Sequence, residues 1–366
     1  MPLRCGIVGL PNVGKSTIFN ALTASSVPAE NYPFCTVDPN IGVVPLPDPR
    51  LKELTSFFNP GKTTPATVEF VDIAGLVRGA SRGEGLGNRF LAQIRQVEAI
   101  IHVVRCFDDD NITHVEGSVD PIRDAELIET ELLMRDIETT EKRLEKAEKE
   151  AKSGGKAAKA RRDFLFLLKN HLNDGRMAQT LDCTPEEKAV LRQLHLLTAK
   201  RILYIANVDE EQITSPDRGE RTAALFDFAS RENNFAVRLC GKLEQDLALL
   251  PPAEQNDYLE EYNLQEIGLH KLIRATYSLL ELETFFTGGP IEVRAWTVRK
   301  GTPASKAAAE IHTDFEHGFI KAEVYCHEDM LDHSSESALR DAGKIRMEGR
   351  NYLVQDGDII YFRFNV

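Results

Sequence analysis

The sequence predicts an α/β fold, in which a mostly parallel sheet is interrupted by a long helical hairpin and followed by a small α+β module. Three observations lead to this prediction. Short apolar runs end in polar or glycine residues, as strands of a parallel sheet do. A charged central segment spaces its apolar residues by three and four, which is typical of helices. The pattern changes again after residue 287.

The first element expected is a strand over Arg4 to Gly9, which leads through a glycine-bearing loop into a helix over Lys15 to Thr23. A strand, a tight loop and a helix in this order open many α/β domains. Short runs rich in β-branched residues predict three further buried strands, at Ala66 to Ile73, Ala99 to Val104 and Arg201 to Ala206.

Between the last two of these strands we expect an inserted antiparallel helical hairpin. A helical stripe is formed by Leu133, Ile137, Thr140, Leu144, Ala147 and Ala151. Ser153-Gly154-Gly155 breaks this run, and a second helix is expected over Lys156 to Asn173. A third helix, over Pro185 to Lys200, is expected to lead back to the sheet.

The C-terminal module begins after Thr287-Gly288-Gly289-Pro290. Alternation predicts a strand over Ile291 to Val298, and Ala304 to Ile311 reads as a helix. Two more strands are expected at Lys321 to Tyr325 and Ile359 to Phe364. We therefore divide the chain into an α/β domain (1–123 and 200–280), which the motifs below make the nucleotide-binding domain, a helical insertion (124–199) and a C-terminal domain (281–366).

Composition limits the classes of function. The 366 residues, 42% of them hydrophobic, suffice for two or three cores. The net charge of −13 argues against a protein that coats nucleic acid, so any RNA contact must come from a local basic patch, and we expect no sequence-specific DNA binding. The six cysteines show no metal-binding spacing, and no apolar run reaches the roughly 20 residues that span a bilayer. We expect reduced thiols, a cytoplasmic location and no membrane partner.

A phosphate-binding loop is indicated by Gly9-Leu10-Pro11-Asn12-Val13-Gly14-Lys15-Ser16, which fits the pattern G-x-x-x-x-G-K-[ST] between a strand and a helix. Backbone N–H groups and the helix N-terminus suit phosphates, while a lysine can reach the β- and γ-phosphates. We expect nucleotide contacts from Asn12, Val13, Gly14, Lys15, Ser16 and Thr17. The Ser16 hydroxyl is also a candidate magnesium ligand.

A second motif, Asp72-Ile73-Ala74-Gly75, follows a predicted strand. Its carboxylate should emerge near the metal, while the Gly75 N–H can meet the γ-phosphate. Thr36 lies in the loop after the first helix, where a hydroxyl can complete the magnesium shell in the triphosphate state. An ordinary loop threonine is the alternative.

Together these motifs resemble the YchF family, also called Obg-like ATPases, a branch of the translation-factor GTPases. The resemblance extends over essentially the whole chain through GLPNVGKST, NYPFCTVDPN, DIAGLVRGAS, GEGLGNRFL, residues 111–121 and QDGDIIYFRFNV. It implies a G-protein-like P-loop domain with a helical insertion. It also implies a C-terminal TGS domain of ubiquitin-like β-grasp shape and an association with the ribosome.

The base-reading motif favours ATP over GTP. Guanine-specific relatives carry Asn-Lys-x-Asp, in which the Asp accepts from guanine N1–H and the 2-amino group. This chain has Asn207-Val208-Asp209-Glu210, and an Asn side chain suits adenine N7 and N6. A permissive pocket that takes either base is the alternative. Backbone groups near Cys240 and Gly241 are expected to form a second base-contacting loop.

Hydrolysis requires a group that positions water. Ras-type enzymes use a Gln after D-x-x-G, but Leu76 stands there in this chain, so the catalytic help comes from elsewhere or hydrolysis is slow. The resemblance places the substitute at His114, although most histidines are surface or packing residues. Arg82 and Glu84 are weaker candidates for this role.

Asn12 is a candidate potassium-binding residue. It resembles the asparagine of relatives that bind potassium beside the nucleotide; the alternative is that it simply shapes the loop.

A basic cluster lies at the predicted hairpin tip, formed by Lys152, Lys156, Lys159, Arg161 and Arg162. A projecting arm would carry these charges away from the acidic body of the protein, so we expect them to contact ribosomal RNA. The alternative is an ordinary solvated turn.

Overall fold

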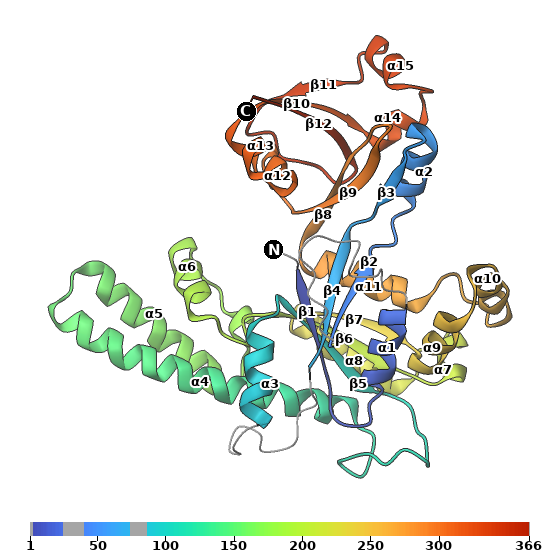
Figure 1. Ribbon diagram of the computed structural model, residues 1–366. Helices are drawn as coiled ribbons and strands as arrows, with labels where there is room; N and C mark the ends of the chain where they lie inside the picture. The colour runs from blue at the N-terminus through green and yellow to red at the C-terminus, as the bar shows by residue number, and fades with distance from the viewer. Residues whose placement is uncertain (1–2, 25–39, 74–85, 366) are drawn as a thin grey trace. The chain divides into compact units, whose positions relative to one another are not determined.

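The computed structural model describes residues 3–24, 40–73 and 86–365, shown in Figure 1. The chain divides into two compact units. The first comprises Met1–Val44 and Glu69–Ala275, and the second comprises Pro45–Val68 and Thr276–Val366. In the described ranges no helix is both long enough and apolar enough to span a membrane, and the five cysteines there are free.

The first unit contains a six-stranded sheet in the order β2-β4-β1-β5-β6-β7. Its strands are β1 (Arg4–Val8), β2 (Ile41–Pro45), β4 (Thr67–Asp72), β5 (Ala99–Arg105), β6 (Arg201–Asn207) and β7 (Phe235–Leu239). The pairs β4–β1, β1–β5, β5–β6 and β6–β7 are parallel. Every residue of the central strand β5 is buried, which explains why it is mostly apolar, with His102 and Arg105 as its polar residues. The predicted parallel sheet is confirmed.

Helices flank this sheet or extend from it. They are α1 (Lys15–Ala24), α3 (Leu86–Arg95), α4 (Pro121–Ser153), α5 (Lys156–Asn173), α6 (Pro185–Leu194), α7 (Glu210–Thr214), α8 (Glu220–Arg231), α9 (Gly241–Leu249), α10 (Pro252–Glu261) and α11 (Gly268–Leu279), with a 3₁₀ turn at Ala178–Thr180. Because β1 leads into α1 through six residues, the N-terminus of α1 lies at the carboxyl edge of the parallel strands. In α/β sheets this edge is where ligands bind.

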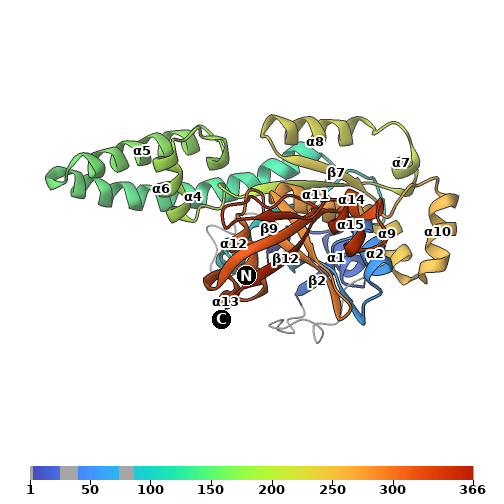
Figure 2. The ribbon, with the colours of Figure 1, turned by 90° about the horizontal axis from the view of Figure 1, so that it is seen from above.

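The helical hairpin predicted from the apolar stripe is present: α4 and α5 lie side by side as an arm of the first unit in Figures 1 and 2. Asp120 caps α4 and Pro121 opens it, while Gly154 ends it in an extended conformation. On α4, Leu144, Ala147 and Ala151 are buried, and Leu168 is buried on α5. Small residues near the tip allow the two helices to approach closely.

A buried carboxylate joins the arm to the sheet. The Asp136 oxygens of α4 accept from the Leu197 and Thr198 backbone N–H groups at 3.1 and 2.7 Å and from the Thr198 hydroxyl at 2.6 Å. The helix expected over Pro185 to Lys200 ends earlier, at Leu194. His195 adopts a left-handed conformation, with φ 49°, that closes the helix and frees the following backbone to bond Asp136.

The second unit has its own six-stranded sheet, in the order β11-β10-β12-β8-β9-β3. Its strands are β3 (Lys62–Thr64), β8 (Leu282–Thr287), β9 (Glu292–Arg299), β10 (Phe319–Cys326), β11 (Arg346–Glu348) and β12 (Asp358–Phe364). Its helices are α2 (Pro49–Phe58), α12 (Ala304–Ile311), α13 (Thr313–His317), α14 (His327–Leu331) and α15 (Glu336–Asp341). Ala304, Ala307 and Ala308 of α12 pack in a core with Phe285 and Phe362. The predicted α+β module is confirmed.

One part of this unit comes from far upstream. Pro45–Val68 groups with the C-terminal residues, and β3 pairs in parallel with β9 through Lys62 and Glu292. Our sequence boundaries placed these upstream residues in the nucleotide-binding domain. A three-residue strand of sequence KTT carries no alternation signal, so its pairing with a strand over 200 residues away cannot be seen in the sequence.

Candidate functional site

Tight backbone geometry forms the predicted phosphate loop between β1 and α1. Asn12 and Gly14 have positive φ angles of 63° and 92°, a region that asparagine tolerates and glycine adopts freely. A Cβ at Gly9 would lie 2.7 Å from the Val103 carbonyl oxygen of β5, so this position also requires glycine. The Ile18 N–H donates to the Gly14 carbonyl at 3.0 Å, which starts α1 directly behind the loop.

The lysine and the aspartate predicted for phosphate and metal meet in the structure. The register of β1 and β4 pairs Ile7 with Asp72, which places that carboxylate beside the loop. Lys15 Nζ forms an ion pair with Asp72 Oδ1. Ser16, the second residue of α1, is exposed. We call the loop 9–16 together with Asp72 the phosphate end of the site.

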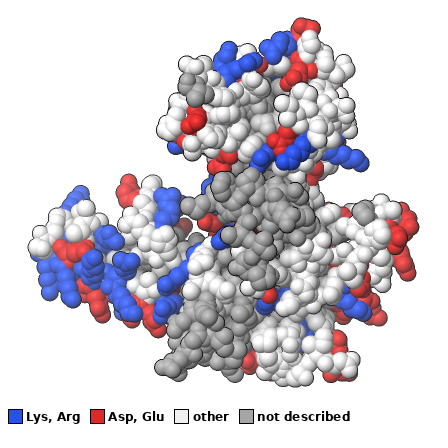
Figure 3. All heavy atoms as spheres, viewed as in Figure 1, with Lys and Arg blue, Asp and Glu red and all other residues white. Residues whose placement is uncertain are grey.

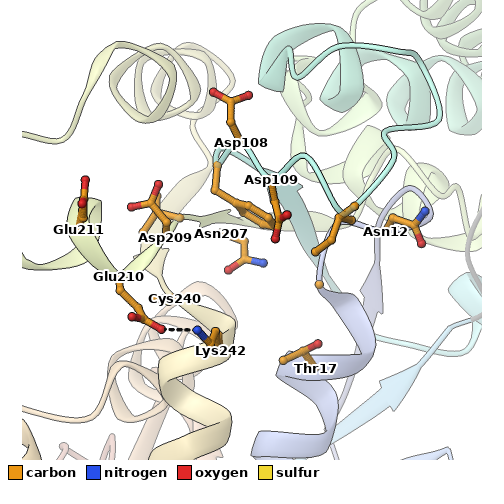
Figure 4. Close-up of a pocket in the computed structure, with 14 residues that line it drawn as sticks. Asn12, Thr17, Asp108, Asp109, Asn207, Asp209, Glu210, Glu211, Cys240 and Lys242 are labelled. Carbon is orange, nitrogen blue, oxygen red and sulfur yellow. Dashed lines mark ion pairs between the residues drawn. The ribbon is translucent and has the colours of Figure 1, made fainter.

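A cavity of about 660 Å³ adjoins the loop (Figure 4). Seven predicted site residues line it: Asn12, Gly14, Thr17, Asn207, Val208, Glu210 and Cys240. Other lining residues were not predicted: Phe107, Asp108, Asp109, Ile112, Asp209, Glu211 and Lys242. We call residues 207–210 and 240–242 the base end of the site.

Asn207 joins the two ends of the site. Its side-chain nitrogen Nδ2 donates to the Val13 carbonyl at 2.9 Å, and its oxygen Oδ1 accepts from the Gly241 N–H at 2.9 Å. The residue is only 4% exposed, so both bonds are shielded from water. One amide hydrogen and one oxygen lone pair remain for a ligand. The Gly241 N–H, in contrast, is already used within the protein.

Two charged side chains meet at the base end. Glu210 is the first residue of α7, and its carboxylate lies 2.9 Å from Lys242 Nζ of α9. Asp209 caps α7 by accepting from the Gln212 N–H at 2.7 Å. The sequence had indicated Glu210 but not its partner, because no motif connects two residues that lie 32 positions apart.

His114 is buried and bonded at both ring nitrogens. Nε2 lies 2.8 Å from Asp124 Oδ2, and Nδ1 accepts from the Glu116 N–H at 3.1 Å. Since Nδ1 accepts, Nε2 carries the proton that is donated to Asp124. Arg123 binds the other Asp124 oxygen at 2.8 Å. His114 is not among the residues described as lining the cavity.

Arg105 organises the loop that leads to His114, which the sequence did not suggest. This arginine at the end of β5 is 2% exposed. Its guanidinium donates to the carbonyls of Phe107, Asp109 and Ile112 at 3.1, 3.2 and 2.8 Å. The Asn12 side chain then reaches the same loop, donating to the Thr113 carbonyl at 3.1 Å. A polar residue at the end of an apolar strand was the only signal in the sequence.

Some predicted site residues fall outside the described ranges: Thr36, Gly75, Arg82 and Glu84. The predicted roles of Thr36 as a metal ligand and of Gly75 at the γ-phosphate therefore stay predictions.

Comparison with known proteins gives matches along the chain. A family model described as "50S ribosome-binding GTPase" matches residues 4–207, and one described as "Protein of unknown function (DUF933)" matches residues 282–365. A Bacillus subtilis protein named "Ribosome-binding ATPase YchF" is 52% identical over 366 residues, covering 100% of both chains. An Escherichia coli O157:H7 protein of the same name is 49% identical over the same length.

A solved structure shows the same fold. The Schizosaccharomyces pombe YchF GTPase superposes with a TM-score of 0.89 at 38% identity, covering 99% of this chain and 97% of that one. A GTP-binding protein from Pyrococcus horikoshii reaches a TM-score of 0.61 at 20% identity, which supports the fold alone. The printed names differ on the nucleotide: some of these proteins are called ATPases and others GTPases or GTP-binding proteins. The choice of base therefore has to be argued from the residues at the base end.

Proposed function

The chain belongs to the YchF family, and from this premise we propose that it hydrolyses ATP, in preference to GTP, to ADP and phosphate as a slow switch on the ribosome. Relatives of about 50% identity are named ribosome-binding ATPases. The observation that carries the proposal is the base end, where Glu210 replaces the guanine-reading Asp and is already paired with Lys242. We place the protein in the cytoplasm, where ribosomes work.

The phosphate end suits a triphosphate. The N-terminus of α1 supplies backbone N–H groups and a positive dipole end. Lys15 can exchange its Asp72 partner for the β- and γ-phosphates when nucleotide arrives. This exchange would leave the Asp72 carboxylate available to hold a metal ion.

The same residues fit Mg²⁺, a hard ion that takes oxygen ligands. Ser16 and Asp72 offer a hydroxyl and a carboxylate beside the loop, and Thr36 is the third ligand expected from the sequence. When bound, Mg²⁺ neutralises charge on the phosphates.

Potassium is a second candidate ion because of Asn12, whose side chain here bonds the Thr113 carbonyl. A higher turnover in potassium than in sodium would support that role.

We assign water activation to His114, after a rearrangement of its loop. In the present arrangement neither ring nitrogen is free to take a proton from water, because one donates to Asp124 and the other accepts from Glu116. Separation of His114 from Asp124 would free the Nε2–H to orient the attacking water, and loss of the Glu116 bond would free Nδ1 to accept a proton from it. The bond from Asn12 to Thr113 connects the nucleotide loop to this segment, so nucleotide binding can influence it.

The helical arm is the proposed contact with ribosomal RNA. Figure 3 shows Lys and Arg gathered on this arm, among some acidic residues. Lys152, Lys156 and Lys159 are exposed around the tip. Arg162 pairs with Asp163 at 2.5 Å, so it contributes less free charge than the sequence suggested. The three lysines are therefore the best candidates for phosphate contacts.

The arm is tested by replacing Lys152, Lys156 and Lys159 with Ala. Ribosome co-sedimentation should weaken, and the slope of log affinity against log salt should fall by up to about three. Replacement of Lys188, Arg192 and Arg231 with Ala removes the same charge elsewhere in the first unit and should have little effect. Equal losses in the two variants would reduce the arm to a solvated turn.

The function as a whole is tested by nucleotide titration and steady-state turnover. We expect tighter binding of ATP than of GTP and slow release of phosphate that changes when ribosomes are added. Equal affinity for both nucleotides would indicate a GTPase with relaxed base specificity. Tight binding without turnover, with or without ribosomes, would indicate a ribosome-binding module whose nucleotide site is structural.

A further inference from the structure

Strand register brings Glu210 and Lys242 together at the base end. The parallel strands β6 and β7 pair Asn207 with Leu239, and the Val208 N–H donates to the Leu239 carbonyl at 2.9 Å. Glu210 lies three residues beyond Asn207, and Lys242 lies three residues beyond Leu239. The segments that follow β6 and β7 therefore leave the sheet side by side and reach the same edge of the cavity.

The position of Lys242 is not explained by the helix that carries it. Lys242 is in the first turn of α9, where the helix dipole disfavours a cation. Glu210, in contrast, is an anion in the first turn of α7, where the dipole of that helix favours a negative charge. The carboxylate 2.9 Å away offsets the unfavourable placement and raises the pKa of Lys242. Asp209 is occupied by the Gln212 N–H, so Glu210 is the partner that this lysine contacts.

A free carboxylate at position 210 would favour guanine. It would accept hydrogen bonds from guanine N1–H and the 2-amino group, whereas adenine offers only a lone pair at N1 and would be repelled. An ammonium group paired with that carboxylate competes with guanine for the carboxylate oxygens. It also neutralises the charge by which the carboxylate would repel adenine. Figure 4 shows the pair at the cavity, with Glu210 and Lys242 both lining it.

We propose that Lys242 determines the base specificity of this site by holding the Glu210 carboxylate in an ion pair, which keeps it from reading guanine and lets the base end accept adenine. This inference rests on the proposed function, since it explains a preference for ATP. It gives Lys242 a role that the sequence motif, which ends at Glu210, does not contain.

The pair is suited to this role because it matters little for folding. The side chains of Lys242 and Glu210 are 75% and 37% exposed, and ion pairs that exposed contribute little to stability. Replacement of Lys242 should therefore leave the fold intact. A change in nucleotide affinity can then be assigned to the site itself.

The experiment measures ATP and GTP dissociation constants for the wild type and four variants. Lys242→Met keeps the aliphatic stem but removes the charge, so the affinity ratio should move toward GTP by roughly tenfold. Lys242→Arg keeps the charge and should retain the wild-type ratio. Adding Glu210→Gln to Lys242→Met removes the freed carboxylate and should reverse most of the gain in GTP affinity. Lys188→Met, on α6, is the control for loss of a surface charge.

The outcomes separate the two claims. The wild-type ratio tests the proposed ATP preference, and the shift on Lys242→Met tests the lysine. An unchanged ratio in Lys242→Met, even with both affinities reduced, would overturn the inference, because Lys242 would then not affect the choice of base. A shift that persists in the double variant would overturn it as well, because the Glu210 carboxylate would then not be its cause. Thermal unfolding of each variant verifies that it is folded, and Lys242→Gln replaces Lys242→Met if the latter is not.

Discussion

The two ends of the nucleotide site are built in different ways. The phosphate end is mainly one continuous loop, with Asp72 beside it, and the backbone and single lysine of this loop suit any nucleoside triphosphate. The base end is assembled from the ends of two strands and the starts of two helices, and its polar side chains bond other groups of the protein: Asn207 to the Gly241 N–H, and Glu210 to Lys242. Affinity should therefore depend mainly on the phosphate end, and the choice of base on contacts within the protein at the base end.

The largest effect should come from Lys15→Ala. Because this side chain faces groups common to ATP and GTP, kcat/KM should fall roughly 1000-fold for both nucleotides, with their ratio unchanged. Steady-state turnover with each nucleotide measures this. A change in the ratio would contradict the division of the site into two ends.

His114→Ala should lower turnover about 100-fold while ATP affinity stays within about twofold. The side chain lies outside the described cavity lining, so it should act on the chemical step and not on binding. Single-turnover hydrolysis and ATP titration separate the two. Asp124→Asn serves as a companion variant, since it weakens the bond that holds His114 in place. Unchanged turnover in His114→Ala would remove the assigned role.

Asn207→Ala should weaken both ends together, because its amide bonds the Val13 carbonyl and the Gly241 N–H. Loss of two buried hydrogen bonds should lower the free energy of unfolding by about 1–3 kcal/mol and ATP affinity by roughly tenfold. Denaturant unfolding and nucleotide titration measure the two effects. A loss of affinity with full stability would mean that Asn207 acts only as a ligand contact.

The last prediction concerns pH and the helix that carries Lys242. Glu244 of α9 accepts from the Gly268 and Leu269 N–H groups, and burial raises its pKa from 4.5 to about 7. A carboxyl whose pKa rises on folding stabilises the protein fully below about pH 4.5, and that stabilisation is lost as the pH increases through about 7. The free energy of unfolding should therefore decrease over this window, by up to about 3 kcal/mol from this group.

Glu244→Gln should flatten part of that pH dependence, as followed by denaturant unfolding from pH 5 to 8. Part of the slope should remain, because burial also raises the pKa of Glu129 to about 7. A Glu244→Gln variant with the wild-type slope would show that Glu244 titrates alike in the folded and unfolded protein.

Contiguous and periodic features were predictable from the sequence. The phosphate loop needs glycines and a lysine at fixed spacing, so its residues identify it without any tertiary information. The arm was predictable because Leu144, Ala147 and Ala151 repeat with the period of a helix. The strands β1, β5 and β6 were equally clear as short apolar runs in a parallel sheet. Each of these features depends on residues that are near neighbours in the chain.

Only the tertiary structure decided which distant residues meet. Strand register placed Lys242 against Glu210, and helix α4 brought Asp124 to His114, so that a predicted catalytic side chain is bonded within the protein. The pairing of β3 with β9 moved an early segment into the C-terminal sheet. Such contacts depend on the packing of whole elements, whereas sequence patterns record only the local periodicity and turn preferences of the chain.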